Sequence, residues 1–140
     1  MQFPHGKAFA FTIFDDTDRA TVANVRGAYE LLGRLGIRIT KSVWPLAPEG
    51  PANMPGSTLA EPDYLAFVRD LQEAGFEIGF HNAAPQDCPR ERTAAGLERF
   101  VELLGREPKV HANHLNNREN LYWGAARLRT WGPRAVYRLA

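Results

Sequence analysis

The chain has 140 residues, with 17 basic and 16 acidic side chains and a formal net charge of +1. This length fits one domain with a hydrophobic core, and the balanced charge gives no overall attraction to nucleic acid. The single cysteine, Cys88, excludes an internal disulfide. No segment approaches the length of a membrane span and the N-terminus lacks a secretory pattern, so we expect a cytoplasmic protein that binds neither nucleic acid nor membranes.

Strand-like and helix-like patterns alternate along the chain, which predicts βα units and a parallel sheet. The predicted strands are 8–14, 37–43, 76–80 and 109–112. Apolar residues at helical spacing predict helices over 21–35, 62–74, about 89–105 and 118–129. A closed parallel barrel needs about eight such units, so the last strand would be an unpaired edge. We expect an open sheet, a second copy of the chain over this edge, or the N-terminal part of a longer barrel.

The stretch 44–59, which follows the second predicted strand, contains four prolines and is predicted to be a loop. Such long loops are often functional. Trp44 at its start could stack on a sugar ring or pack the loop onto the body of the protein, because both uses suit an amphipathic aromatic side chain.

Two carboxylates, Asp15 and Asp16, directly follow the first predicted strand, and Asp18 comes two residues later. The apolar run 8–14 before them suits a buried strand, and ligands of parallel α/β proteins collect at the carboxyl ends of strands. Adjacent residues of an extended chain point to opposite faces, so Asp15 and Asp16 can take different roles, such as base and metal ligand. The alternative is that one acid caps the next helix and the others are solvated.

His81 ends the third predicted strand, and the segment 111–117, HANHLNN, follows the fourth. We expect Asp16 and His81 to converge, because the ends of parallel strands meet at one edge of the sheet. If the chain stays extended, His111 and His114 face opposite sides and only one reaches this edge, whereas an earlier turn would allow both. Asp and His ligands suit Zn²⁺, or alternatively Co²⁺ or Mn²⁺.

The order of these motifs resembles the polysaccharide deacetylase family, also called the NodB-homology or carbohydrate esterase family 4 domain. The resemblance rests on FDD at 14–16 and GFEIGFH at 75–81, and it covers nearly the whole chain. It implies a deformed (β/α) barrel, with 1–140 as one domain or as the N-terminal part of a longer barrel. It also implies a divalent metal, removal of acetyl groups from N-acetylated sugars, Asp15 as general base, and Asp16 and His81 as metal ligands.

Two positions depart from the pattern of that family. Pro85 stands where the family has a second metal-binding histidine, and Ala112 where it has the arginine that orients the base. We therefore expect His114, or alternatively His111, to supply the third metal ligand. The general-acid histidine of the family would lie beyond residue 140.

The main prediction is thus a metal-dependent hydrolase that acts on N-acyl groups of a carbohydrate, with Trp44, Asn113 and Asn116 as contacts to the sugar. A non-catalytic module that binds a metal or a sugar is one alternative, because a fold does not fix a function. The other is a haloacid-dehalogenase-type phosphatase. In that scheme Asp16 is the nucleophile, Asp18 is the acid/base, and Thr40 and Lys41 match later motifs.

Overall fold

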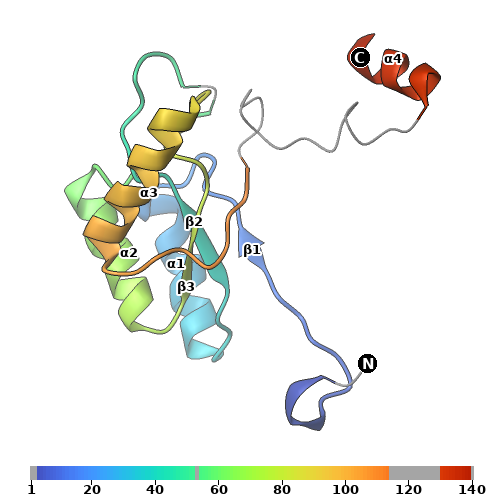
Figure 1. Cartoon of the computed structure of the whole chain (residues 1–140). Helices are drawn as coiled ribbons and strands as arrows, with labels where there is room; N and C mark the ends of the chain where they lie inside the picture. The colour runs from blue at the N-terminus through green and yellow to red at the C-terminus, as the bar shows by residue number, and fades with distance from the viewer. Residues whose placement is uncertain (1–2, 53, 114–129, 140) are drawn as a thin grey trace.

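The computed structural model describes residues 3–52, 54–113 and 130–139, which form the mixed α/β structure that the sequence predicts (Figure 1). Three parallel strands lie side by side in chain order, β1 (Phe14–Asp15), β2 (Thr40–Val43) and β3 (Glu77–Phe80). The helices are α1 (Val22–Arg34), α2 (Pro62–Glu73), α3 (Arg90–Leu104) and α4 (Trp131–Leu139), and a single 3-10 turn covers Pro4–Gly6. The described residues do not form a closed barrel.

The sheet has a helix face, on which α1, α2 and α3 pack, and an opposite face (Figure 1). Ile78 and Phe80, two residues apart on β3, and Val43, which pairs with Phe80, join the hydrophobic core on the helix face. On the opposite face, the hydroxyl of Thr40 donates a hydrogen bond of 2.6 Å to the carboxylate of Glu77. This period of two decides which side chains at the strand ends can meet.

The fourth predicted strand, 109–112, is reduced to one parallel bridge between Phe80 and His111. The backbone N–H of Phe80 donates to the carbonyl of Val110 (2.9 Å), and the N–H of Ala112 donates to the carbonyl of Phe80 (3.0 Å). The chain therefore passes along the free side of β3 in the place that a fourth strand would take.

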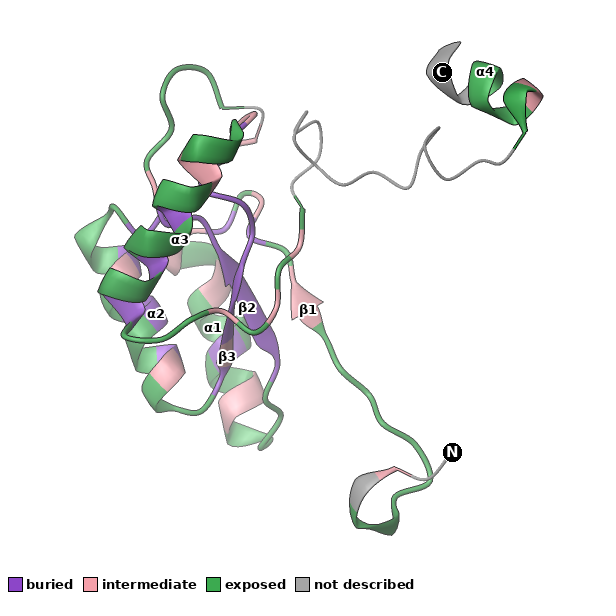
Figure 2. Cartoon of the chain, viewed as in Figure 1, coloured by how far each residue is buried: buried purple, intermediate pink, exposed green. Residues whose placement is uncertain are grey.

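The predicted strand 8–14 is wrong in extent, because β1 begins only at Phe14. Before it, the side chains of Phe9 and Phe11 are 76% and 79% exposed, and the whole segment lies open to solvent (Figure 2). An apolar run is buried only where neighbouring elements cover it. Within the described part of the chain, β1 is paired on one side only, with β2.

The helix boundaries follow local signals in the sequence. Thr21 caps α1 through a capping box, in which Asn24 N–H donates to Thr21 Oγ1 (3.3 Å) and Thr21 N–H donates to Asn24 Oδ1 (2.8 Å). Pro62 begins α2, and Gly105, with φ of 73°, ends α3. The predicted helix 118–129 lies outside the described residues, and the sequence patterns do not predict α4. Among the described helices, none has both the length and the apolar character of a membrane span.

Gly96 allows α3 to pack closely on the segment that follows β3. A Cβ atom at this position would lie 2.5 Å from Ala83 Cβ and 2.8 Å from Ala83 Cα. We expect Gly96→Ala to lower the free energy of unfolding by about 1–3 kcal/mol, because overpacking outweighs the gain in helix propensity. Urea unfolding curves measure the change.

The matched control is Gly27→Ala in α1, where nothing lies within 4 Å of the added Cβ atom. This substitution should raise the free energy of unfolding by about 0.5–1 kcal/mol, since alanine has the higher helix propensity. Equal stabilisation by both substitutions would contradict the close packing at Gly96.

Candidate metal site

Two strand ends converge on the opposite face of the sheet, as the sequence predicts for Asp16 and His81. The Nε2 atom of His81 lies 3.4 Å from Asp16 Oδ1 and 3.8 Å from Asp18 Oδ1. One possible ligand atom from each of the three residues lies within 4.8 Å of the other two. We call these three residues the Asp–Asp–His cluster.

Thr17 explains why Asp16 and Asp18 face the same way. It is fully buried, and its hydroxyl lies 3.3 Å from the hydroxyl of Tyr64 in α2. With Thr17 packed into the core, its two acidic neighbours lie on the other side of the chain, where both approach His81. The backbone N–H of Asp18 also donates to Asp16 Oδ1 (3.1 Å), which fixes the turn.

The metal ligands predicted from the sequence do not include Asp18. The signal that identifies it is the spacing of Asp16 and Asp18 around a threonine that faces the core. The sequence shows the spacing, but only the contact with Tyr64 on α2 shows that Thr17 is the buried member.

The loop between β2 and α2 holds this turn in place. The N–H of Arg19 donates to the carbonyl of Pro55 (2.6 Å), and the N–H of Ser57 donates to the carbonyl of Ala20 (2.7 Å). Gly56 lies between these two hydrogen bonds. A Cβ atom at this position would lie 2.9 Å from Trp44 Cζ3, so the close approach of the loop backbone to the indole ring requires glycine.

Trp44 is fully buried, with its ring centroid 6.0 Å from that of His81. The side chain has no exposed face on which a sugar ring could stack, so the prediction that Trp44 contacts substrate has no support in this geometry. Packing, the other use considered for Trp44, is what the structure shows: the indole lies between the loop and His81 and restricts the imidazole ring.

Each of the two chain segments that carry the cluster is followed by a residue with left-handed backbone geometry. Arg19 (φ 61°) directly follows Asp18, and Asn82 (φ 58°) directly follows His81. This conformation is uncommon for residues other than glycine and gathers at functional sites. Here it turns the chain away immediately after the second and third members of the cluster.

Asp15 points to the helix face, away from the Asp–Asp–His cluster. Its Oδ2 atom accepts a hydrogen bond of 2.6 Å from the hydroxyl of Tyr29 and lies 2.9 Å from Lys41 Nζ. The opposed directions of Asp15 and Asp16 follow the alternation expected for a strand. They also mean that Asp15, the predicted general base, does not face the cluster in this structure.

Lys41 is completely buried. Burial lowers the pKa of Lys41, and the carboxylate of Asp15 opposes that shift. Burial and the hydrogen bond to Asp15 raise the pKa of Tyr29 well above its usual value. A haloacid-dehalogenase-type phosphatase would need Lys41 beside its nucleophile, Asp16, but Lys41 instead pairs with Asp15.

The other predicted residues lie near the same edge or outside the described part of the chain. His111 Nε2 lies 3.0 Å from Asn82 Oδ1, and the ring packs edge-on against Phe80, so His111 is not a member of the cluster. Burial lowers the pKa of His111. Asn113 is exposed. His114 and Asn116 lie outside the described residues.

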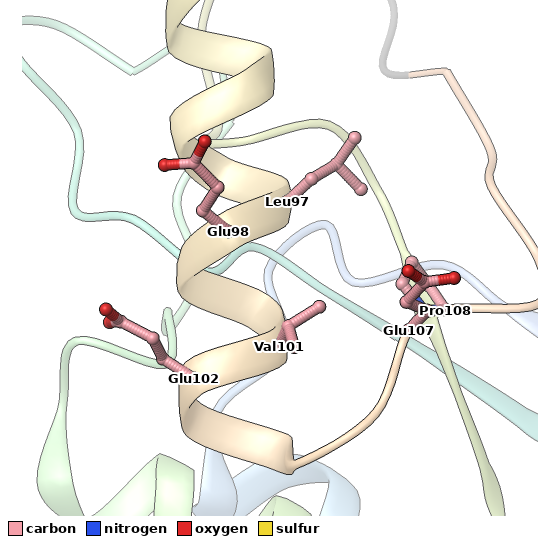
Figure 3. Close-up of a pocket in the computed structure, with 6 residues that line it drawn as sticks. All are labelled: Leu97, Glu98, Val101, Glu102, Glu107 and Pro108. Carbon is pink, nitrogen blue, oxygen red and sulfur yellow. The ribbon is translucent and has the colours of Figure 1, made fainter.

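A pocket of about 570 Å³ is lined by none of these residues. Figure 3 shows the residues that line it. Leu97 and Val101 of α3 and Pro108 form its apolar surface, and three glutamates surround it, Glu98, Glu102 and Glu107. The pocket lies where the chain enters the bridge at His111, whereas the Asp–Asp–His cluster lies where the strands end. It therefore adds no group to the candidate site.

Comparison of the chain with protein-family models, with curated proteins and with solved structures found no match.

Proposed function

We propose that Asp16, Asp18 and His81 bind one divalent metal ion, and that the chain is a metal-dependent hydrolase acting on an N-acyl group of a carbohydrate. The observation that carries the proposal is the convergence of two carboxylates and one imidazole at the ends of two parallel strands. The carbohydrate substrate rests on the FDD and GFEIGFH motifs and their resemblance to the polysaccharide deacetylase family.

The spacing of the donor atoms fits an ion between them. Two ligands about 2.1 Å from a tetrahedral Zn²⁺ are about 3.4 Å apart. The 3.4 and 3.8 Å separations between His81 Nε2 and the two carboxylate oxygens are close to this value and longer than charge-assisted hydrogen bonds. Two carboxylates and one imidazole suit Zn²⁺, Mn²⁺ or Co²⁺.

The residues of the Asp–Asp–His cluster differ in how far their side chains are exposed to solvent. The side chain of His81 is 6% exposed and packs on Trp44, whereas the side chain of Asp16 is 64% exposed. The cluster is therefore anchored on the protein side and open on the solvent side, where a substrate can approach. Three protein ligands leave a position for water, as catalytic metal sites require.

A bound ion would polarise the acyl carbonyl and lower the pKa of its water ligand. In this proposal Asp16 and Asp18 hold the ion, and a carboxylate oxygen that does not bind the ion would accept the proton that the water releases. Lys41 and Tyr29 hold Asp15 on the helix face, so a role for Asp15 as base requires its side chain to leave both partners.

We also propose that the sheet is part of a deformed (β/α) barrel of the NodB type. Three features support this proposal: the parallel strands lie in chain order, the helices cover one face, and the polar cluster sits at the carboxyl ends of the strands.

The test is metal analysis of the purified protein together with acetate release from N-acetylated chito-oligosaccharides. We expect about one ion per chain, activity that a chelator removes, and recovery of activity with Zn²⁺, Co²⁺ or Mn²⁺. A protein that binds metal but releases no acyl group from acetylated or formylated sugars would be the non-catalytic module. A protein that binds none of the three ions would overturn the proposal.

A further inference from the structure

The outer edge of β1 exposes an apolar segment that continues the strand toward the N-terminus. Residues 8–14 read AFAFTIF and contain no charge and no proline. Phe9, Phe11 and Ile13, which are alternate residues, are 76%, 79% and 38% exposed (Figure 2). Edge strands of soluble proteins are usually short or charged, because a long apolar edge pairs with another chain.

We propose that this segment pairs in antiparallel fashion with the same segment of a second copy of the chain, around a two-fold axis at Phe11. The pairing would join the two sheets along their β1 edges, with both helix faces on one side. It would place Phe11 opposite Phe11 of the second copy, and Phe9 opposite Ile13 of the second copy. Such an isologous contact closes on itself and gives a dimer.

The charges at the two ends of the segment favour this register. Lys7 and Asp15 are the first charged residues on either side of the apolar run, and they would lie opposite each other in both halves of the dimer. Lys7 and Asp15 are an even number of residues apart, so in an extended strand both side chains point to the helix face. The side chain of Asp15 is 32% exposed and already lies beside the buried Lys41. A second ammonium group can approach Asp15 from solvent.

The neighbouring registers lose this complementarity. An axis at Ala10 would place Lys7 opposite Ile13, and an axis at Thr12 would place Phe9 opposite Asp15. Each arrangement sets a charged group against an apolar side chain, which is unfavourable for a directly opposed pair. The axis at Phe11 is the one of the three that pairs charge with charge and apolar with apolar.

The size of the contact predicts a reversible dimer. Two phenylalanines and one isoleucine would bury on the order of 400 Å² per copy, or roughly 800 Å² in total, below the standard interface of about 1,600 Å². We therefore expect monomer at low concentration and dimer at high concentration in analytical ultracentrifugation. Phe11→Asp should raise the dissociation constant at least about tenfold, because each copy would place a carboxylate at the centre of an apolar contact.

Cysteine cross-linking of the full chain tests the register. Opposed Cα atoms of antiparallel strands lie about 4.5–5.5 Å apart, within the range that a disulfide spans. Phe11→Cys should therefore give a covalent dimer on mild oxidation. The native Cys88 is buried, so the wild-type chain sets the background.

Phe9→Cys is the matched control, because in this register the two introduced cysteines lie about 13 Å apart, too far for a disulfide. The double variant Phe9→Cys/Ile13→Cys should again give the covalent dimer, since the cysteine at position 9 of each copy then lies opposite the cysteine at position 13 of the other copy. Equal cross-linking of the single variants at positions 9 and 11 would overturn the register. A wild-type chain that stays monomeric at all concentrations would overturn the dimer, and neither result bears on metal binding.

Discussion

Replacing Asp18 with alanine is expected to reduce the affinity of the protein for Zn²⁺ by at least about 100-fold. Residues that only support a metal ligand already contribute about 10–100-fold to affinity, so the loss of one ligand from a set of three should cost at least as much. His81→Ala should have an effect of the same size, because His81 supplies the nitrogen donor of the cluster. Isothermal titration with Zn²⁺ and metal analysis after dialysis measure both losses.

The matched control is His111→Ala. This histidine lies at the end of the neighbouring chain segment but contacts Asn82 and Phe80 instead of the cluster, so its removal should leave the affinity for Zn²⁺ within about threefold of wild type. The comparison also separates two ligand sets. Loss of metal in Asp18→Ala but not in His114→Ala would support the Asp–Asp–His cluster, whereas the reverse result would support the set predicted from the sequence.

Replacing Asp15 with asparagine is expected to lower the free energy of unfolding by about 3 kcal/mol. Removing one partner of a buried ion pair costs about 3–5 kcal/mol, and the lower end applies because the side chain of Asp15 is 32% exposed. The substitution would leave the ammonium group of Lys41 in the core without its counter-charge. Chemical denaturation at neutral pH measures the loss.

The double variant Asp15→Asn/Lys41→Met is the control for this interaction. It removes the buried charge together with its partner, so it should recover roughly 2 kcal/mol of the stability lost in Asp15→Asn alone. The contrary outcome is that the stability losses of Asp15→Asn and Lys41→Met simply add up in the double variant. The two residues would then be energetically independent, which contradicts the ion pair seen in the structure.

The pH dependence of Asp15→Asn gives a second readout. Burial lowers the pKa of Lys41 and Asp15 opposes that shift, so without Asp15 the pKa should fall further. The unfolded chain then binds more protons than the folded one between this lowered pKa and the ordinary lysine value of about 10.4. The stability of Asp15→Asn should therefore rise with pH across that window, relative to the double variant. A flat difference would show that Lys41 binds the same number of protons in the folded and unfolded states, so that its pKa is not lowered in Asp15→Asn.

Local patterns in the sequence account for much of the fold. The order of strands and helices, the cap of α1 at Thr21, the proline that begins α2 and the glycine that ends α3 all depend on residues close together in the chain. The alternation of side chains along a strand also predicts that Asp15 and Asp16 diverge and that Asp16 meets His81. These features are predictable because they follow from backbone geometry and residue type alone.

Contacts between distant segments decided the rest. The residues before Phe14 have the composition of a buried strand, yet Phe9 and Phe11 are exposed because they precede the first paired residue of β1 and no described element covers them. Trp44 is buried because the loop that contains Gly56 folds back over it. Asp18 faces His81 because Thr17, its neighbour, contacts Tyr64 of helix α2. A sequence pattern specifies which side chains share a face, whereas the burial of that face depends on which other elements pack against it.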